Sequence, residues 1–254
     1  MPLIPDPAPN AGNAAPAGAS DPSLGEKLDR FYTDQKRSGD MQTTEIPISL
    51  LLALDGIATG AYAGDAGARE KQQSAHKGEL TAHLRRVSAY ARLLALKCGL
   101  DEEEAKLVAQ VSPMHDIGKW MIPAHILQKP AALDAEEWAI MKTHTLAGYE
   151  ILKDSKLEVL KLSAMVAMQH QEKFDGSGYP LGLKGEEIHL YSRITTVADV
   201  FDALGSARAY KRSWTDLEIV EYFQSNRGTH FDPALVDILL RDLGAFVAVR
   251  EGFG

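Results

Sequence analysis

A histidine and an aspartate stand in direct succession at His115 and Asp116, and Lys119 follows within one helical turn. Adjacent imidazole and carboxylate groups can reach one divalent cation, and the carboxylate has a second oxygen with which to bridge to another. Lys119 is at i+4 from His115, so on a helix its amine points the same way and can meet an anion. These residues predict a metal site with an anion-binding group beside it.

Further residues that can bind a metal fall on other predicted helices. Helical bundles build metal sites from inward-facing side chains of several helices, so we expect these residues to converge. Histidine and carboxylate without thiolate suit iron, manganese or zinc. Any one of these histidines alone would more often lie in the core or on the surface, and only their joint positions favour a site. They are His83, His144, His170 and Asp199.

Two more polar residues lie near these positions. Asp202, at i+3 from Asp199, is expected either to hydrogen-bond the metal ligands or to lie on a helix surface. Arg86, at i+3 from His83, is expected to pair with a carboxylate or to approach the substrate.

Composition excludes several classes of protein. The chain of 254 residues is 45% hydrophobic, which is enough for a globular core. A formal charge of −8 without a Lys/Arg run argues against general nucleic-acid binding. Cys98 is the only cysteine, so no intramolecular disulfide can form and a reducing compartment is expected. No secretory signal is visible, and Pro47 and Asp55 interrupt the longest apolar run, so we expect a cytoplasmic protein without a membrane span.

The remaining pattern is that of helix following helix, and the expected fold class is all-α. Residues 1–23 are a Pro/Ala-rich tail that we expect to be disordered, 24–70 a helical lead-in, and 71–254 the main domain. Apolar spacing predicts helices over 24–37, 46–58, 79–98, 101–114, 135–152, 157–170 and 189–206, with two more beginning at Asp216 and Pro233.

One segment cannot be helical. Residues 175–185 contain four glycines and a proline, so we expect a structured loop. Gly176 and Gly178 permit positive φ, and we expect Pro180 to stiffen the exit of the loop and Tyr179 to be an exposed aromatic residue.

Together these motifs resemble the HD superfamily of metal-dependent phosphohydrolases, and the segment Phe174-Asp-Gly-Ser-Gly-Tyr-Pro180 resembles the loop that defines its HD-GYP subgroup. The similarity extends over about 45–245 and includes Ile126-Leu-Gln-Lys-Pro130, the run from Arg193 to Leu204, and Gly228-Thr-His-Phe-Asp-Pro233. The resemblance implies an HD-domain helical bundle that hydrolyses cyclic di-GMP to pGpG, GMP or both.

The resemblance also implies roles for individual residues. His83, His115, Asp116 and Asp199 would hold one metal ion, and Asp116 would bridge to a second ion held by His144 and His170. Some members bind a third ion with a glutamate one turn before the first histidine, and Glu79 stands at i−4 from His83. The implied cofactors are therefore two or three divalent ions, with iron or manganese favoured.

The chemistry of such a pair of ions fits phosphodiester cleavage. Two metals about 3.5 to 4 Å apart lower the pKa of a shared water, so that hydroxide attacks phosphorus in line with the departing ribose oxygen. Lys119 would neutralise charge on the phosphoryl oxygens. Tyr179, Arg208 and Lys211 resemble residues that contact the nucleotide. On one straight helix Arg208 and Asp199 would face apart, so we expect Gly205 to end or bend that helix.

The sequence departs from the family pattern at Gln171, where most members have histidine. An amide oxygen is a poorer ligand for a transition metal than imidazole, so the second metal should bind more weakly. Three readings stay open: a working phosphodiesterase, a degenerate member that binds cyclic di-GMP or a diguanylate cyclase (GGDEF) partner without hydrolysis, and a hydrolase of another nucleotide or cyclic dinucleotide. For the Gly-Tyr-Pro loop, the family implies either lining the cleft or docking the cyclase.

Overall fold

The structure is a computed structural model that describes residues 26–30, 33–34, 66–206 and 212–253. Residues 26–30 and 33–34 are helical. The helices that follow are α3 (Ala66–Lys97), α4 (Glu102–Val111), the 3-10 helix η1 (Ser112–Met121), α5 (Ala124–Leu127), α6 (Ala135–Lys142), α7 (His144–Leu152), α8 (Glu158–Gln169), the 3-10 helix η2 (Gly185–Glu187), α9 (Leu190–Gly205), α10 (Asp216–Ser225), α11 (Pro233–Arg241) and α12 (Leu243–Gly252).

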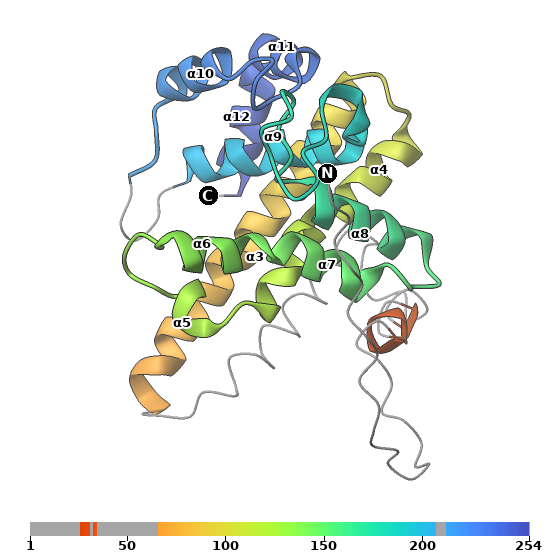
Figure 1. The fold of residues 1–254 in the computed structure, drawn as a ribbon. Helices are drawn as coiled ribbons and strands as arrows, with labels where there is room; N and C mark the ends of the chain where they lie inside the picture. The colour runs from red at the N-terminus through yellow and green to blue at the C-terminus, as the bar shows by residue number, and fades with distance from the viewer. Residues whose placement is uncertain (1–25, 31–32, 35–65, 207–211, 254) are drawn as a thin grey trace.

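The expected all-α fold class is confirmed. Within the described ranges β pairing is limited to an isolated bridge between Arg227 and Phe231. Figure 1 shows α3 running diagonally through the molecule, with α6 and α7 crossing in front of it and α10, α11 and α12 gathered at one end.

The larger hydrophobic core lies between α3, α4 and α9 and the three C-terminal helices. Its centre is aromatic: Tyr90 of α3 meets Phe201 of α9 edge to face, with ring centroids 5.1 Å apart, and Phe246 of α12 packs against both. Each buried aromatic side chain removes about 150 to 250 Å² from water, so this cluster fixes α3 against α9. These two helices carry His83 and Asp199.

A second hydrophobic cluster is formed by side chains of η1, α7 and α8, and it also includes Leu28 from the short helix at 26–30. Beside Leu28, the Asp29 carboxylate accepts hydrogen bonds from the Ser155 hydroxyl and from the backbone N–H of Lys156, the latter at 3.1 Å. Both partners lie in the connection between α7 and α8. Residues 26–30 are therefore fastened to the turn of this helical hairpin.

Several helix boundaries differ from the sequence predictions. α3 begins at Ala66 rather than near residue 79, and α12 was not predicted. The helix expected over 135–152 divides at Thr143, whose hydroxyl donates to the carbonyl of Ile140 at 2.7 Å. The helix expected over 46–58 lies outside the described residues, as do the tail at 1–23 and most of the lead-in.

The expected loop over 175–185 is confirmed, and Glu172 holds it in place. The buried Glu172 carboxylate accepts hydrogen bonds from the backbone N–H of Leu181 at 2.7 Å and of Leu183 at 3.1 Å. Gly176 has the expected positive φ of 86°. The φ of Gly178 is not positive, and glycine is needed there for a different reason, because a Cβ would lie 2.3 Å from the backbone nitrogen of Lys173.

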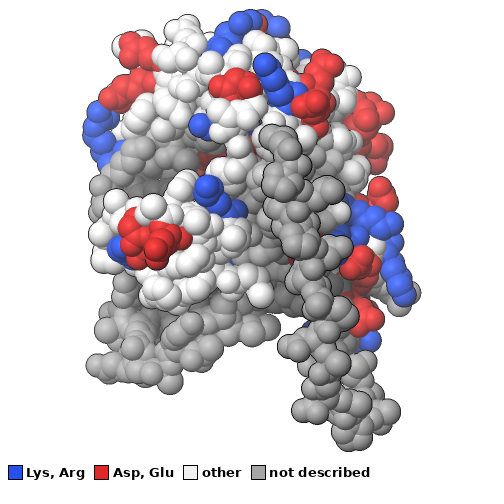
Figure 2. Space-filling view, in the orientation of Figure 1, with Lys and Arg blue, Asp and Glu red and all other residues white. Residues whose placement is uncertain are grey.

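No helix in the described part of the chain is both long and apolar enough to cross a membrane. On the face drawn in Figure 2, the acidic and basic side chains that the structure describes are intermingled, and neither sign gathers into one continuous patch. The described side chains of this face therefore form no extended positive surface of the kind that a nucleic-acid backbone requires.

Candidate metal centre

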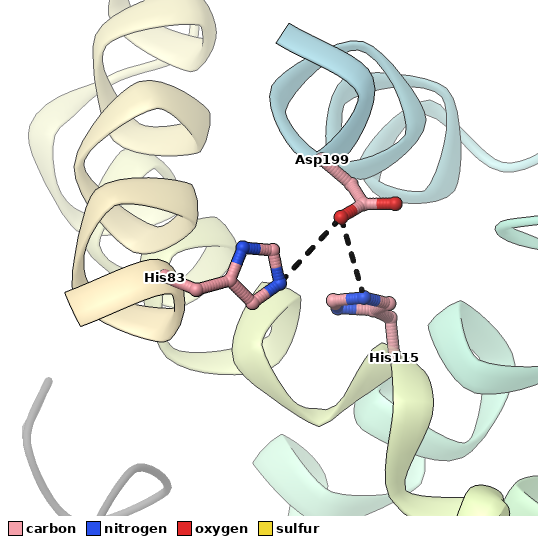
Figure 3. Close-up of side chains that lie close together, drawn as sticks. All are labelled: His83, His115 and Asp199. Carbon is pink, nitrogen blue, oxygen red and sulfur yellow. Dashed lines mark ion pairs between the residues drawn. The ribbon is translucent and has the colours of Figure 1, made fainter. Parts of the chain in front are cut away.

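Three helices bring together His83, His115 and Asp199, which we call the first group. Figure 3 shows the Asp199 carboxylate of α9 facing the imidazoles of His83 on α3 and His115 on η1. One Asp199 oxygen lies 3.6 Å from His83 Nε2 and 3.7 Å from His115 Nε2. All three potential ligand atoms lie within 4.8 Å of one another, which is close enough for one cation.

Asp116, His144 and His170 form the second group. Asp116 Oδ1 lies 3.5 Å from the Nε2 atom of each histidine, and the two Nε2 atoms are 3.3 Å apart. His144 is the first residue of α7 and His170 is the C-cap of α8, so both lie at the open end of the α7–α8 hairpin.

Asp116 links the two groups. Its Oδ2 lies 3.3 Å from His115 Nε2 of the first group, while Oδ1 faces the second. Lys119 Nζ donates to the same Oδ2 at 2.5 Å. Lys119 Nζ therefore lies beside the carboxylate oxygen that faces His115, and the 3-10 geometry of η1, with about three residues per turn, places Lys119 over Asp116.

Backbone carbonyls fix the tautomers of three of the histidines. In His115, His144 and His170, Nδ1 donates to the carbonyl three residues earlier, at 2.8 to 2.9 Å. Because a carbonyl can only accept, Nδ1 carries the proton and Nε2 of the neutral ring presents a lone pair. Each lone pair therefore points into one of the two groups, as metal ligation requires.

His83 is held by a carboxylate instead. Its Nδ1 lies 2.8 Å from Oδ2 of the buried Asp202, leaving Nε2 toward Asp199. Arg86 grips the same carboxylate with Nε at 2.6 Å and Nη2 at 3.0 Å. Of the two roles that the sequence left open for Asp202, the structure favours the hydrogen-bonding one.

We expect Asp202→Asn to weaken cation binding at the first group about 10- to 100-fold, because loss of a carboxylate behind a ligating histidine lowers its basicity and loosens its orientation. Metal competition with a chelator, normalised to the folded fraction, measures this. The exposed Asp237→Asn is the matched control. Equal affinity in Asp202→Asn and the parent chain would contradict the role assigned to Asp202.

The charges of the two groups favour a cation. Burial would lower the pKa of His115, but the carboxylates of Asp116 and Asp199 outweigh it and raise this pKa to about 9. Burial would raise the pKa of Asp116, but Lys119 and His115 hold it well below its ordinary value. Burial lowers the pKa of His144 to about 4, so this imidazole is neutral at pH 7. In the second group an ionised Asp116 therefore faces the neutral imidazole of His144, whereas in the first group His115 gives up a proton when it binds a cation.

The residues fit divalent metal ions. His115 Nε2 and Asp116 Oδ1 are buried without a hydrogen-bond partner, which is costly unless another species satisfies them. In the second group two imidazole lone pairs face each other, an arrangement that a cation between them would relieve. The donor atoms are imidazole nitrogens and carboxylate oxygens without a thiolate, and this set suits iron, manganese or zinc.

Two glycines allow the second group to assemble. Gly118 of η1 lies so close to α7 that a Cβ would come within 1.9 Å of the carbonyl oxygen of His144. A Cβ on Gly148 would come within 2.9 Å of the Ala167 side chain. Both glycines therefore permit close helix packing, and the requirement is stricter at Gly118.

The other predicted site residues lie in different surroundings. Glu79 is exposed, and neither group among the described side chains includes it. Arg208 and Lys211 lie outside the described residues, although α9 does end at Gly205 as expected. Gln171 directly follows His170 and is half-buried, and its backbone carbonyl accepts from the N–H of Tyr179 at 3.2 Å.

Tyr179 is not the exposed residue that the sequence suggested. It is half-buried, with its ring centroid 6.4 Å from that of His144, and burial together with the charge of Asp116 raises its pKa to about 12. Its phenol is therefore protonated at pH 7 and leans toward the second group. This placement favours the cleft-lining role over the docking role.

Trp138 was missed from the sequence. It lies edge to face with Tyr179, with ring centroids 6.4 Å apart. The available signal was a large aromatic residue that directly follows two glutamates and stands six residues before His144.

Comparison with known proteins identifies a family. Residues 71–235 match the family described as HD domain. The 3'3'-cGAMP-specific phosphodiesterase 2 of Vibrio cholerae is 48% identical over 176 residues, which cover 69% of this chain and 34% of that protein. The cyclic di-GMP phosphodiesterase response regulator RpfG of Xanthomonas campestris pv. campestris is 47% identical over 164 residues, which cover 65% of this chain and 43% of that protein.

The chain thus spans less than half the length of either relative. Among solved structures, the HDGYP-type protein Bd1817 from Bdellovibrio bacteriovorus superposes with a TM-score of 0.54 at 16% identity, covering 87% of this chain and 70% of that one. At this identity the likeness shows a shared fold alone.

Proposed function

The chain belongs to the HD domain family, and from that premise we propose that it is a metal-dependent phosphodiesterase that hydrolyses cyclic di-GMP to pGpG, GMP or both. The observation that carries the proposal is the convergence of four imidazole Nε2 atoms and two carboxylates into two groups that share Asp116. Relatives at 48% and 47% identity are named as phosphodiesterases of cyclic dinucleotides.

We assign one cation to each group, with iron or manganese favoured by the donor set. Asp116 would contact both. A third cation would need Glu79, whose exposed position outside both groups argues for two. When bound, the cations supply Lewis-acid activation of water and of the phosphodiester.

The chain's own residues would bind and orient the substrate. Lys119 holds its ammonium beside Asp116, where it can neutralise charge that builds on phosphoryl oxygens. The Tyr179 hydroxyl, protonated at neutral pH, can donate a hydrogen bond into the same space. Arg208 and Lys211 remain proposed nucleotide contacts on the strength of the sequence motif.

We expect Gln171→His to strengthen cation binding at the second group on the order of tenfold or more, because an imidazole is a better donor than an amide oxygen. Metals per chain, counted by elemental analysis after dialysis against a limiting chelator, report the change.

The matched control is Gln224→His, which places the same new imidazole on the exposed side of α10. If Gln171→His and the parent chain retain equal metal, position 171 does not serve the second group.

Hydrolysis of 3'3'-cyclic GMP-AMP is a second candidate function. The relative that is 48% identical carries that specificity in its name, and the 47% identical relative is named for cyclic di-GMP. The two substrates differ in one base and share the phosphodiester ring, so the metal groups would act on both in the same way.

The test is an anaerobic reconstitution of the purified chain with Fe(II) or Mn(II), with metals counted and both cyclic dinucleotides followed by chromatography. Metal-dependent turnover supports the enzyme, and the ratio of the two kcat/KM values identifies the preferred substrate. Substrate recovered intact with both groups filled would instead favour a protein that binds cyclic di-GMP or a diguanylate cyclase without hydrolysis.

A further inference from the structure

α6 is unusual among the helices of the described ranges because it carries an exposed tryptophan and no buried residue. Trp138 is 47% exposed, whereas Trp120 and Trp214 are half-buried. The helix is held at its start by the Asp134 capping box rather than by core packing. A single exposed aromatic side chain is ordinary in itself, so the surroundings of Trp138 decide whether it has a role.

The position of Trp138 relative to the metal centre supplies one. The Trp138 ring meets Tyr179 edge to face at 6.4 Å, and Tyr179 meets His144 of the second group edge to face at the same distance. Two aromatic contacts thus connect the exposed indole with a proposed metal ligand. Lys142 Nζ lies 6.0 Å from the centroid of the Tyr179 ring and adds positive charge to this edge of the site.

This arrangement matches the shape of a nucleotide. A phosphate held at the second group is joined through a ribose to a planar base, and the base needs a flat, apolar surface a short distance from the phosphate. Exposed aromatic faces bind bases in this way because every base has a π-face, and tryptophan offers the largest such face. The contact requires no base-specific hydrogen bond.

We infer that Trp138 is a substrate-binding residue on which a purine base of the nucleotide stacks, beside Tyr179, while the phosphate lies at the second group. The inference rests on the proposed function and deepens it, since it names a residue that recognises the base. Its consequence is that affinity for a nucleotide and affinity for a bare sugar phosphate depend on different residues.

Direct binding separates these two affinities. The Mn(II)-loaded chain is titrated by calorimetry with GMP and with ribose 5-phosphate, which has the phosphate and sugar without the base. We expect Trp138→Ala to weaken GMP binding about 10- to 100-fold while ribose 5-phosphate binds as before. Trp138→Phe, which keeps an aromatic face, should recover most of the loss.

Ile140→Ala is the matched control, because Ile140 is 41% exposed on the same helix and two residues away, toward a different side. It should bind both ligands like the parent chain. Unchanged GMP affinity in Trp138→Ala, or an equal loss for GMP and ribose 5-phosphate, would overturn the inference, since the latter indicates a distorted site.

Turnover provides a second readout. For Trp138→Ala, the ratio of kcat/KM on cyclic di-GMP to that on bis(p-nitrophenyl) phosphate, a diester without a base, should fall about 10- to 100-fold. A parent chain that cleaves neither diester refutes the proposed function but leaves the calorimetric test of Trp138 intact, so the two failures are distinguishable.

Discussion

Asp116→Ala is expected to reduce turnover of a cyclic dinucleotide by at least about a thousandfold and to lower the number of metals that the chain retains. Asp116 is the residue through which the two groups meet, with Oδ2 at 3.3 Å from His115 and Oδ1 at 3.5 Å from both His144 and His170. Its removal takes a negative charge from both proposed cations at once. It also leaves Lys119 without the carboxylate to which it donates.

The experiment needs two readouts and one control. Metals per chain and the rate of dinucleotide cleavage are measured on the same preparations, after circular dichroism has shown equal helix content. Asp154→Ala is the control, because Asp154 is an exposed carboxylate in the connection that follows α7. Asp116→Ala protein with full metal content and parental turnover would refute the assignment of the centre.

Gly118→Ala is expected to destabilise the fold by more than about 3 kcal/mol. The added Cβ would lie 1.9 Å from the backbone oxygen of His144 and 2.4 Å from the backbone nitrogen of Gly148, so neither obstacle is a side chain that can rotate away. η1 and α7 would have to separate, which moves Asp116 away from His144. Thermal unfolding should show a midpoint lower by on the order of 10 °C.

Gly244→Ala is the natural comparison. Nothing lies within 4 Å of a Cβ at Gly244 in α12, so alanine should stabilise the chain by about 0.5 to 1 kcal/mol through its higher helix propensity. A Gly118→Ala variant as stable as the parent chain would show that η1 can shift away from α7 at little cost.

The sequence was informative where chemistry and periodicity agreed. Apolar spacing predicted both ends of α8 and α9 and the starts of α10 and α11 to within about two residues, because each has one face in a core. The residue types of the two groups were visible for a related reason, since histidine and aspartate at inward-facing positions of a helical bundle have few other uses.

What the sequence could not show depends on tertiary contacts. Nothing in residues 135–152 indicates a break at Thr143, and nothing near Gly118 indicates the 3-10 geometry of η1 or its close approach to α7. The half-buried position of Tyr179 depends on the loop fold that Glu172 fixes from nine and eleven residues away. Local helix and turn propensities do not report such tertiary contacts, so they could not predict these features.

The hydrogen bonds of Asp29 join residues 26–30 to the same helical hairpin that carries two of the proposed metal ligands. His144 and His170 lie at the open end of the α7–α8 hairpin. Asp29 accepts hydrogen bonds from Ser155 and Lys156 at its closed end. Arms of nine and twelve residues are roughly 14 to 18 Å long. The contact that holds residues 26–30 is therefore one helix length away from the two imidazoles, whose Nε2 atoms lie 3.3 Å apart.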